Sequence, residues 1–225
     1  MRAICGIVGF KGSCVTSDDL EVLKQIMIES RIRGMHASGI AWFDGKGLQS
    51  FIKPIPIDKL VEQFDFTELS MDSSVSMIAH ARYSTSDIRY NQPIVGEKLA
   101  IAHNGVLTQS NPDTWEETYG YKCKTQNDSE LLLHMLENGT PPEEVLRTSS
   151  IAALTLDGTT GELVPLRNSL RPLWTGKVGN SIIYASTYDI LNRAGVSDIS
   201  KVKPVRNQDL QRRDYRQWSE HKKRA

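Results

Sequence analysis

The side chains that could carry out chemistry begin with Cys5, which opens the stretch Cys5-Gly6-Ile7-Val8-Gly9-Phe10. A cysteine followed by small and β-branched residues predicts a buried strand that carries a thiol at its leading end. Most buried cysteines are inert, so this stretch alone indicates little about function. A reactive thiol is a nucleophile that forms a thioester with an acyl group, which water can later resolve. Cys5 is therefore the candidate nucleophile.

Two charged residues further along the chain are suited to hold a substrate beside such a nucleophile. Arg82 lies in His80-Ala81-Arg82-Tyr83-Ser84-Thr85, and its planar guanidinium can grip a carboxylate with two parallel hydrogen bonds. Asp128 lies in Asn127-Asp128-Ser129-Glu130 and can hold an ammonium group as a fixed anion. Together they suit the head group of an amino acid. Taken singly, Arg82 could form an ordinary salt bridge and Asp128 could be the N-cap of a helix.

A third group, His103-Asn104-Gly105, has several readings. Asn-Gly most often marks a tight turn. A dyad of Cys5 with a histidine, or a metal site built from Cys5, His80 and His103, is an alternative chemistry. The spacing of these residues fits no standard zinc pattern, and a histidine at a strand end is more often a hydrogen-bonded structural residue. We therefore expect no metal and no other cofactor.

Five islands in this order and spacing resemble the glutaminase domain of class II glutamine amidotransferases. That family uses an N-terminal cysteine to take ammonia from glutamine. The resemblance runs from about Cys5 to about Pro204 and rests on Cys5–Phe10, Ile32–Gly39, His80–Thr85, His103–Gly105 and Asn127–Glu130. It implies an α+β fold, the four-layer αββα sandwich of two antiparallel sheets. It also implies hydrolysis of free L-glutamine to glutamate and ammonia through a Cys5 thioester.

The resemblance assigns roles around the nucleophile. Asn104 and the backbone N–H of Gly105 would form the oxyanion hole. Arg33 matches the arginine that supports the loop of the nucleophile. The later matches, Asn168–Leu173 and Ala185-Ser186, are interpreted as core and loop geometry and not as catalytic residues.

The resemblance also assigns the binding of glutamine. Arg82 and Thr85 would hold its carboxylate, and Asp128 would hold its ammonium. His36 departs from the family pattern, which usually carries an acidic residue at or beside that position, and Ser86 stands where relatives that feed sugar synthesis often carry histidine. An amide other than free glutamine is a weaker alternative, because Arg82 and Asp128 both suit an amino-acid head group.

The base in this family is the α-amine of the cysteine itself, whose unperturbed pKa of about 7.7–8.0 suits work near neutral pH. Here Met1-Arg2-Ala3-Ile4 precede Cys5, so its nitrogen is an amide and cannot take the proton of the thiol. We expect residues 1–4 to be a leader removed by cleavage between Ile4 and Cys5. The alternatives are a true start elsewhere, or a catalytically silent module that binds glutamine or acts as a scaffold.

Hydrophobic periodicity predicts the helices that must position these groups. Thr16, with Asp19 three residues later, indicates a helix start, and the apolar residues from Leu20 to Met27 recur at helical spacing. That helix should end near Arg33-Gly34, with glycine as a left-handed cap. Further helices are predicted over 58–64, 129–138 and 143–149, and the segment 108–127 as loop with a short helix.

Strands are predicted over 38–43, 48–53, 75–81, 99–102, 151–156, 162–167 and 181–186. The strand 75–81 should deliver Arg82 at its exit, and the strand 99–102 should deliver His103-Asn104-Gly105 in the same way. Strands in antiparallel hairpins, with helices in two separate blocks, favour a layered α+β fold over alternating βαβ units.

The composition limits the remaining possibilities. A chain of 225 residues suits one domain, and 27 basic against 27 acidic residues give no general electrostatic case for nucleic acid or an anionic membrane. No apolar run approaches the roughly 20 residues of a membrane helix. Three cysteines without CxxC spacing suggest neither a disulfide framework nor a zinc site, so a cytoplasmic setting is expected.

The domain should span 5–204, followed by a basic tail over 205–225. The tail is interpreted as a solvated end of the chain, with a docking arm for an acidic partner or nucleic acid as the alternative. Family members usually pass ammonia to a synthetase, and no synthetase fits into the remaining residues. An ammonia-accepting enzyme on a separate chain is therefore the expected partner.

Overall fold

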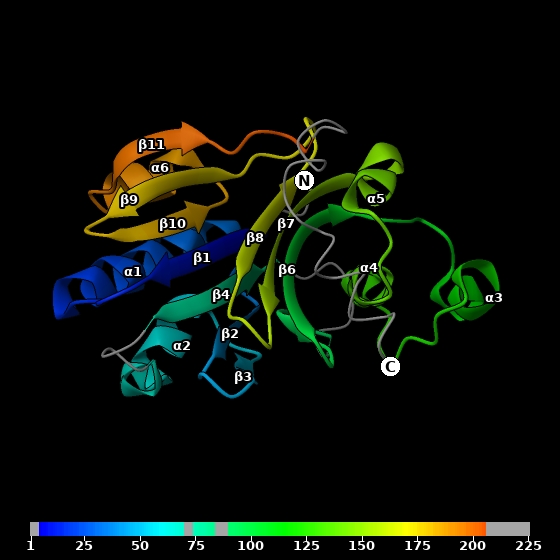
Figure 1. Cartoon of the computed structure of the whole chain (residues 1–225), viewed down its shortest axis with the longest axis horizontal. Coiled ribbons are helices and arrows are strands. Elements are labelled where there is room, and N and C mark those ends of the chain that lie inside the picture. Colours follow the sequence, from blue (N-terminus) through cyan, green and yellow to red (C-terminus); the bar gives the residue numbers. More distant parts are fainter. Residues whose placement is uncertain (1–4, 70–73, 84–89, 206–225) are drawn as a thin grey trace.

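The computed structural model describes residues 5–69, 74–83 and 90–205 (Figure 1). Two antiparallel sheets face each other, and helices cover both outer faces. The predicted α+β class and the four-layer αββα sandwich are confirmed. The expected leader, 1–4, and nearly all of the basic tail lie outside the described residues.

The larger sheet has seven strands and carries β1 at its centre. Its order is β11-β9-β10-β1-β4-β2-β3. The bounds are β1 Gly6–Gly12, β2 Ala37–Phe43, β3 Leu48–Lys53, β4 Val75–Arg82, β9 Trp174–Val178, β10 Ser181–Ala185 and β11 Ser197–Lys201. β1 pairs antiparallel with β10 on one side and β4 on the other. The strand that leads away from Cys5 is therefore held on both edges.

The smaller sheet has four strands in the order β5-β6-β7-β8. Its strands are β5 Ile94–Val95, β6 Leu99–Val106, β7 Ser150–Asp157 and β8 Leu163–Arg167. Each strand is antiparallel to its neighbours, so β6 is hydrogen-bonded to β7 along its whole length.

Helices pack on the outer face of each sheet (Figure 1). Those against the larger sheet are α1 Ser17–Glu29, α2 Ile57–Gln63 and α6 Tyr188–Arg193. Those against the smaller sheet are α4 Asp128–Glu137 and α5 Pro142–Thr148. The remaining short elements are α3 Trp115–Tyr119 and the 3₁₀ helices η1 Ser30–Arg33, η2 Phe66–Glu68 and η3 Pro112–Thr114.

The strands alternate between two cores because successive side chains point to opposite faces of a sheet. On β1, Val8 and Phe10 lie under the helices, whereas Ile7 faces the other sheet. On β6, Ala100 and Ala102 face back across the same gap. These small side chains allow the two sheets to approach closely.

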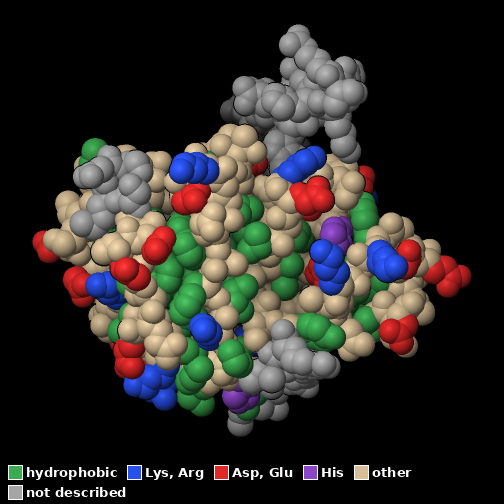
Figure 2. Space-filling model, turned by 90° about the horizontal axis from the view of Figure 1, so that it is seen from below, with side chains coloured by type: hydrophobic (Ala, Val, Ile, Leu, Met, Phe, Trp, Pro, Cys, Tyr) green, Lys and Arg blue, Asp and Glu red, His purple; other side chains and the backbone are tan. Residues whose placement is uncertain are grey.

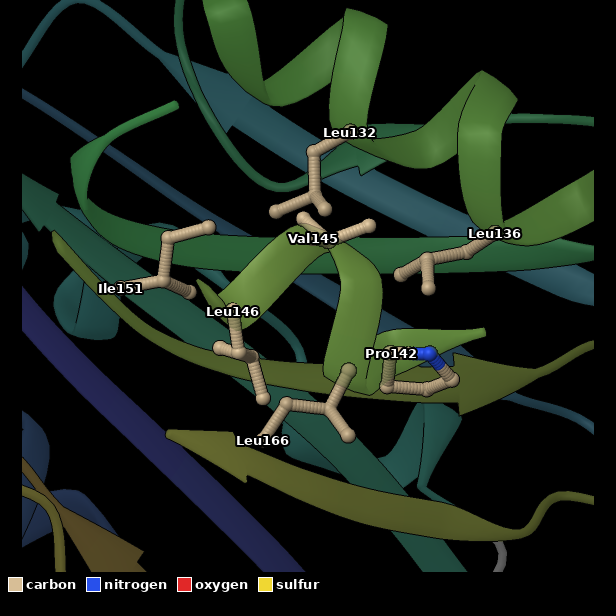
Figure 3. Close-up of a pocket in the computed structure, with 7 residues that line it drawn as sticks. All are labelled: Leu132, Leu136, Pro142, Val145, Leu146, Ile151 and Leu166. Carbon is tan, nitrogen blue, oxygen red and sulfur yellow. The ribbon is translucent and has the colours of Figure 1, made fainter. Parts of the chain in front are cut away.

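A small apolar cavity lies between α4, α5 and the outer face of the smaller sheet (Figure 3). Its lining is entirely hydrophobic and consists of Leu132, Leu136, Pro142, Val145, Leu146, Ile151 and Leu166. No polar group is directed into it from these residues, so it is a packing gap in the core beneath the helices.

Most predicted elements are present, with local corrections. Thr16 caps α1 and forms the predicted capping box with Asp19. The prediction that Gly34 is a left-handed cap is wrong, because its backbone is extended with φ −168°. A Cβ at Gly34 would lie 2.3 Å from the backbone carbon of Arg82, so glycine is needed there for close approach.

β6 extends beyond its predicted end at residue 102. His103-Asn104-Gly105 was expected after the strand, but all three residues lie within it, paired with Ala153, Ala152 and Ile151 of β7. The tight-turn reading of Asn104-Gly105 is therefore wrong. The periodicity also did not predict β5, β9, β11 or α6.

A histidine is buried between the sheets. His80 on β4 is 0% exposed, and neither ring nitrogen has a hydrogen bond of normal geometry within the described chain. Burial, and then the neighbouring His103, lower the pKa of His80 to about 3, although the nearby Asn104 amide acts in the opposite direction. His80 is therefore neutral in the folded protein near pH 7.

This burial predicts a loss of stability in acid. In the unfolded chain His80 has a pKa near 6.5, whereas in the folded protein its pKa is about 3. Between these values only the unfolded chain binds the proton, so the free energy of unfolding decreases as the pH drops below about 6.5. His80 should account for a loss of about 2 kcal/mol between pH 8 and pH 5. Denaturant unfolding of the wild type and of His80→Gln, each at pH 8 and pH 5, measures this loss.

The comparison at pH 8 is the internal control, because it reports the packing cost of the substitution while the wild-type histidine is neutral. His80→Gln should show a smaller loss of stability than wild type between the two pH values. An equal loss in both proteins would contradict the assigned neutral state of His80.

Candidate active site

The alternation of side chains brings three predicted site residues to the same gap between the sheets. Cys5 precedes β1 in phase with Ile7, Arg82 ends β4, and Asn104 follows Ala102 by two positions on β6. Arg82 and Asn104 are each 8% exposed, and Cys5 is half-buried. The fold therefore concentrates these groups at one end of the inter-sheet layer.

The backbone carbonyl of Cys5 is the point where the two halves of the site meet. Arg33 Nε, from η1, donates a hydrogen bond to it at 3.2 Å. Asn104 Nδ2, from the opposite sheet, donates to the same oxygen at 2.7 Å. The position of Cys5 is thus fixed from both sides of the gap. The contact of Arg33 agrees with its expected supporting role, which stays a prediction.

Asn104 is itself oriented by Ser186, which directly follows β10. Asn104 Nδ2 donates to Ser186 Oγ at 3.0 Å, and the same hydroxyl accepts the backbone N–H of Ile7 at 2.8 Å. Both hydrogens of the Asn104 amide are therefore engaged, one by Cys5 and one by Ser186. Its Oδ1 is buried without a hydrogen-bond partner among the described residues.

Glycine is required at position 105. Its φ is +141°, and an added Cβ would lie 1.7 Å from the carbonyl oxygen of Ser150 on β7. Any side chain would force β6 away from β7 at the position next to Asn104. The backbone N–H of Gly105 is the second expected donor of the oxyanion hole.

The thiol of Cys5 lies in a partly desolvated, cationic environment. Burial raises its pKa, while the backbone of Tyr83 and the positive charges of Arg82, Arg33 and Arg171 act in the opposite direction. The contact between Cys5 Sγ and the carbonyl oxygen of Tyr83 is long, at 3.9 Å. A thiol in this state is mostly protonated at neutral pH, so it needs a base.

Arg82 is held by the segment that leads into β5. Its Nη1 donates to the carbonyl of Tyr90 and, at 2.9 Å, to Asn91 Oδ1. Asn127, the N-cap of α4, also donates to the carbonyl of Tyr90, at 3.3 Å. The start of α4 and the guanidinium are therefore tied to a single backbone group.

Asp128 is the first residue of α4, with Asn127 as the N-cap, so the alternative that Asp128 is only an N-cap is wrong. Its Oδ2 accepts the N–H of Leu107 at 2.7 Å, and its Oδ1 lies 3.9 Å from His103 Nδ1. A negative charge is favourable in the first turn of a helix. Asp128 is therefore a fixed anion in line with its expected role, which stays a prediction.

His103 points away from Cys5, toward α4. Its Nδ1 is 2.9 Å from Ser129 Oγ, and the side chain of Gln92 pairs with its backbone N–H and carbonyl. Burial lowers its pKa, against the opposing charge of Asp128. Within the described residues no group of three potential metal ligands lies together. Thr85 and Ser86 lie outside the described residues.

The rim of the site carries exposed apolar side chains. Ile32 and Met35 are 63% and 50% exposed. The ring of Tyr83 lies 4.6 Å from the ring of His36, the residue that departs from the family pattern, with the two planes tilted by 42°. Elsewhere, on the face shown in Figure 2, acidic and basic side chains are interspersed around hydrophobic ones. No helix in the described part of the chain is long and apolar enough to cross a membrane.

Several residues of the site were not predicted from the sequence. Ser186 and Arg171 were interpreted as structural, and Tyr90, Asn91 and Gln92 were not singled out. Their contacts join residues far apart in the chain, so no local pattern predicts them. The cluster of polar residues immediately before Pro93 was the available signal for the last three.

Among curated proteins, the chain is similar to part of the glutamine–fructose-6-phosphate aminotransferases. It is 32% identical over 157 residues to a glutamine–fructose-6-phosphate aminotransferase of Bartonella henselae, covering 65% of this chain and 24% of the relative. The corresponding Helicobacter pylori protein is 27% identical over 202 residues, covering 84% of this chain and 33% of the relative. The chain therefore spans between a quarter and a third of these relatives. No family model matches the sequence.

Solved structures agree on the fold. The glutamine phosphoribosylpyrophosphate amidotransferase of Bacillus subtilis superposes with a TM-score of 0.69 at 22% identity, covering 89% of this chain and 46% of that one. A second structure, an allosteric regulatory enzyme of purine biosynthesis, gives 0.70 at 24% identity, covering 89% and 45%. In sequence and in fold, the chain is similar to class II glutamine amidotransferases over the segment that it shares with them.

Proposed function

We propose that this chain hydrolyses free L-glutamine to glutamate and ammonia through a thioester on Cys5. The observation that supports this most strongly is the double hydrogen bond to the Cys5 carbonyl from Arg33 and Asn104. It fixes the residue while leaving its thiol in the gap between the sheets. Arg82 and Asp128 supply the charges needed to hold the carboxylate and the ammonium of glutamine, with Thr85 as a further contact to the carboxylate.

The base in this proposal is the α-amine of Cys5, released by cleavage between Ile4 and Cys5. The amine takes the proton of the thiol, sulfur attacks the side-chain amide carbon, and the proton then leaves with ammonia. Without cleavage the nitrogen is an amide and cannot do this. Burial raises the pKa of the thiol, so the uncleaved chain would hold little thiolate at neutral pH.

The tetrahedral intermediate would be stabilised by Asn104 and the backbone N–H of Gly105. Both amide hydrogens of Asn104 are already donated, one to Cys5 and one to Ser186. One of these hydrogen bonds must therefore break before Asn104 can donate to the oxyanion. The bond to the Cys5 carbonyl is the one that can be released, because that oxygen keeps a second donor in Arg33.

The ammonia would be consumed by an acceptor enzyme on a separate chain. The relatives are three to four times longer than the segment they share with this chain, which covers 24% and 33% of them. They are named glutamine–fructose-6-phosphate aminotransferases, which supports transfer of the glutamine nitrogen to an acceptor. A reducing compartment such as the cytoplasm suits a nucleophile that must stay a free thiol.

A catalytically silent module that binds glutamine is the alternative function. The residues ahead of Cys5 and the raised pKa of its thiol favour it for the uncleaved chain. The two functions differ in whether release of the Cys5 amine produces turnover.

The first prediction compares three purified forms: full length, a form that starts at Cys5, and Cys5→Ala starting at the same position. The Cys5-start form should release glutamate from glutamine far faster than the other two, because it alone has both the thiol and a basic amine. Coupled glutamate detection and an intact mass for each protein measure this.

Two results would contradict the proposal. Equal activity in a full-length protein whose mass still includes residues 1–4 would remove the α-amine as the base. Binding of glutamine without turnover in the Cys5-start form would favour the silent module.

The second prediction separates binding from turnover. Arg82→Lys should weaken glutamine binding about 10- to 100-fold, because an ammonium cannot reproduce a bidentate fork and a charge-assisted bond contributes roughly 1.5–3 kcal/mol. Calorimetry with Cys5→Ala as the parent measures the affinity without hydrolysis.

Asn104→Ala is the matched contrast in the same assays. Glutamine affinity should change little, whereas turnover of the Cys5-start form should fall roughly 10²- to 10³-fold, the usual cost of one oxyanion donor. If Asn104→Ala instead binds poorly and turns over normally, Asn104 is a specificity residue and the oxyanion assignment is wrong.

A further inference from the structure

Arg171 lies in a rigid loop after β8. The buried side chain of Arg167 holds this loop, since its Nε donates to the carbonyl of Arg171 at 2.8 Å and its Nη1 to the carbonyl of Val202 at 2.6 Å. Asn168 adds side-chain hydrogen bonds to the carbonyls of Leu146 and Ser149. The backbone of Arg171 is therefore fixed relative to the smaller sheet.

The side chain of Arg171 reaches the end of β7 that adjoins the oxyanion site. Its Nε donates to Ser150 Oγ at 2.9 Å. Ser150 pairs with Val106 on β6, and its carbonyl oxygen is the atom that excludes a side chain from Gly105. The guanidinium thus lies next to the Asn104-Gly105 segment, and its terminal nitrogens have no hydrogen-bond partner in the described chain.

Arg171 is the third arginine around Cys5, after Arg33 from η1 and Arg82 from β4. Burial raises the pKa of Cys5, and the positive charge of Arg171 opposes this rise, after those of Arg82 and Arg33. Burial lowers the pKa of Arg33 and of His103, and the charge of Arg171 acts in the same direction on both. Three groups on different elements therefore respond to this one guanidinium.

Among residues 5–69, 74–83 and 90–205, the other titratable groups near Cys5 do not cancel this positive charge. His80 on β4 and His103 on β6 are buried, and burial lowers the pKa of each. Asp128 on α4 is the nearby anion, and its Oδ2 is already bonded to the Leu107 N–H. The gap therefore carries an excess of positive charge on its Cys5 side.

We propose that Arg171 is an electrostatic positioning residue of the glutamine site, which stabilises negative charge on Cys5 and on the tetrahedral intermediate through its own fixed charge. The inference rests on the proposed glutaminase activity. It assigns a chemical role to a loop that sequence reasoning interpreted as structural.

Arg171 would act at the two steps of the reaction in which negative charge develops near Cys5. The thiol proton passes to the free α-amine, so sulfur becomes negative as the carbon–sulfur bond forms. The carbonyl oxygen then carries the negative charge until the carbon–nitrogen bond breaks and the proton leaves with ammonia. A fixed cation favours both anionic states, and it also disfavours a resting ammonium on Cys5, which keeps the base neutral.

The test uses the Cys5-start form and four variants. Arg171→Gln removes the charge, and Arg171→Lys keeps it while losing the planar fork. Ser150→Ala removes the anchor alone, and Arg193→Gln makes the same charge change at an exposed residue that pairs with Glu29 on α1. Glutamate release gives kcat and KM, and iodoacetamide, a neutral reagent, gives the pH dependence of Cys5 alkylation by mass spectrometry.

Arg171→Gln should lower kcat/KM about 10-fold, mainly through kcat, and move the alkylation profile of Cys5 to higher pH. Arg171→Lys should keep most of the kcat/KM and of the alkylation profile of the parent. Ser150→Ala should lower kcat/KM less than Arg171→Gln does. Arg193→Gln should match the parent. Equal losses in Arg171→Gln and Arg171→Lys, with an unmoved alkylation profile, would identify a purely structural role and overturn the proposal.

The alkylation measurement also separates this inference from the proposed function. It needs no turnover, so it reports the influence of Arg171 on Cys5 even if the parent releases no glutamate. A parent that hydrolyses glutamine while Arg171→Gln matches it in both assays would overturn the role of Arg171 alone.

Discussion

The site depends on the hydrogen bonds that two opposed elements donate to the carbonyl of Cys5. Arg33 approaches from η1 beneath the larger sheet, and Asn104 approaches from the smaller sheet. Neither sheet alone could fix this residue. The small side chains at the inter-sheet face of β6 let the layers come close enough for an asparagine amide to span the gap. The four-layer packing is therefore a condition for the hydrogen bonds around Cys5 as well as for stability.

Burial and charge act on the site in opposite directions. Withdrawal from water disfavours the thiolate of Cys5, whereas the arginines around it favour that form. The histidines between the sheets and beside α4 are held neutral, so they add no further cation near pH 7. As a result, the thiol of Cys5 stays protonated near pH 7 unless a base removes its proton. The arginine charges would then stabilise the negative charge that forms.

The sequence predicted those secondary-structure elements that are determined by contacts between residues close together in the chain. The capping box of Thr16 and Asp19 is a contact between residues three apart, and its side chains determine the helix start directly. The alternation along β4 likewise placed Arg82 at the end of a buried strand. The order of strands and helices predicted a layered α+β fold, and the family resemblance narrowed it to the four-layer αββα sandwich.

The remaining features arise from contacts between distant residues. Ser186 bonds to the backbone of Ile7, 179 positions away, and Asn104 bonds to Cys5, 99 positions away. β9 contains a glycine and a lysine, and it is a strand because β10 and β11 pair with it on both edges. Gly34 resembled a helix cap in sequence, but the approach of the β4 backbone determines its conformation. The roles of Arg171 and Ser186 depend on the same tertiary contacts.

The central claim is that Cys5 carries the acyl group during turnover. The most direct measurement is an acid quench of the Cys5-start form during reaction with excess glutamine, followed by mass spectrometry of the N-terminal peptide. The account predicts a glutamyl adduct on Cys5 that hydroxylamine removes, with Cys14 and Cys123 unmodified. Release of glutamate with no adduct on Cys5 at any quench time, or an adduct on another residue, would contradict it.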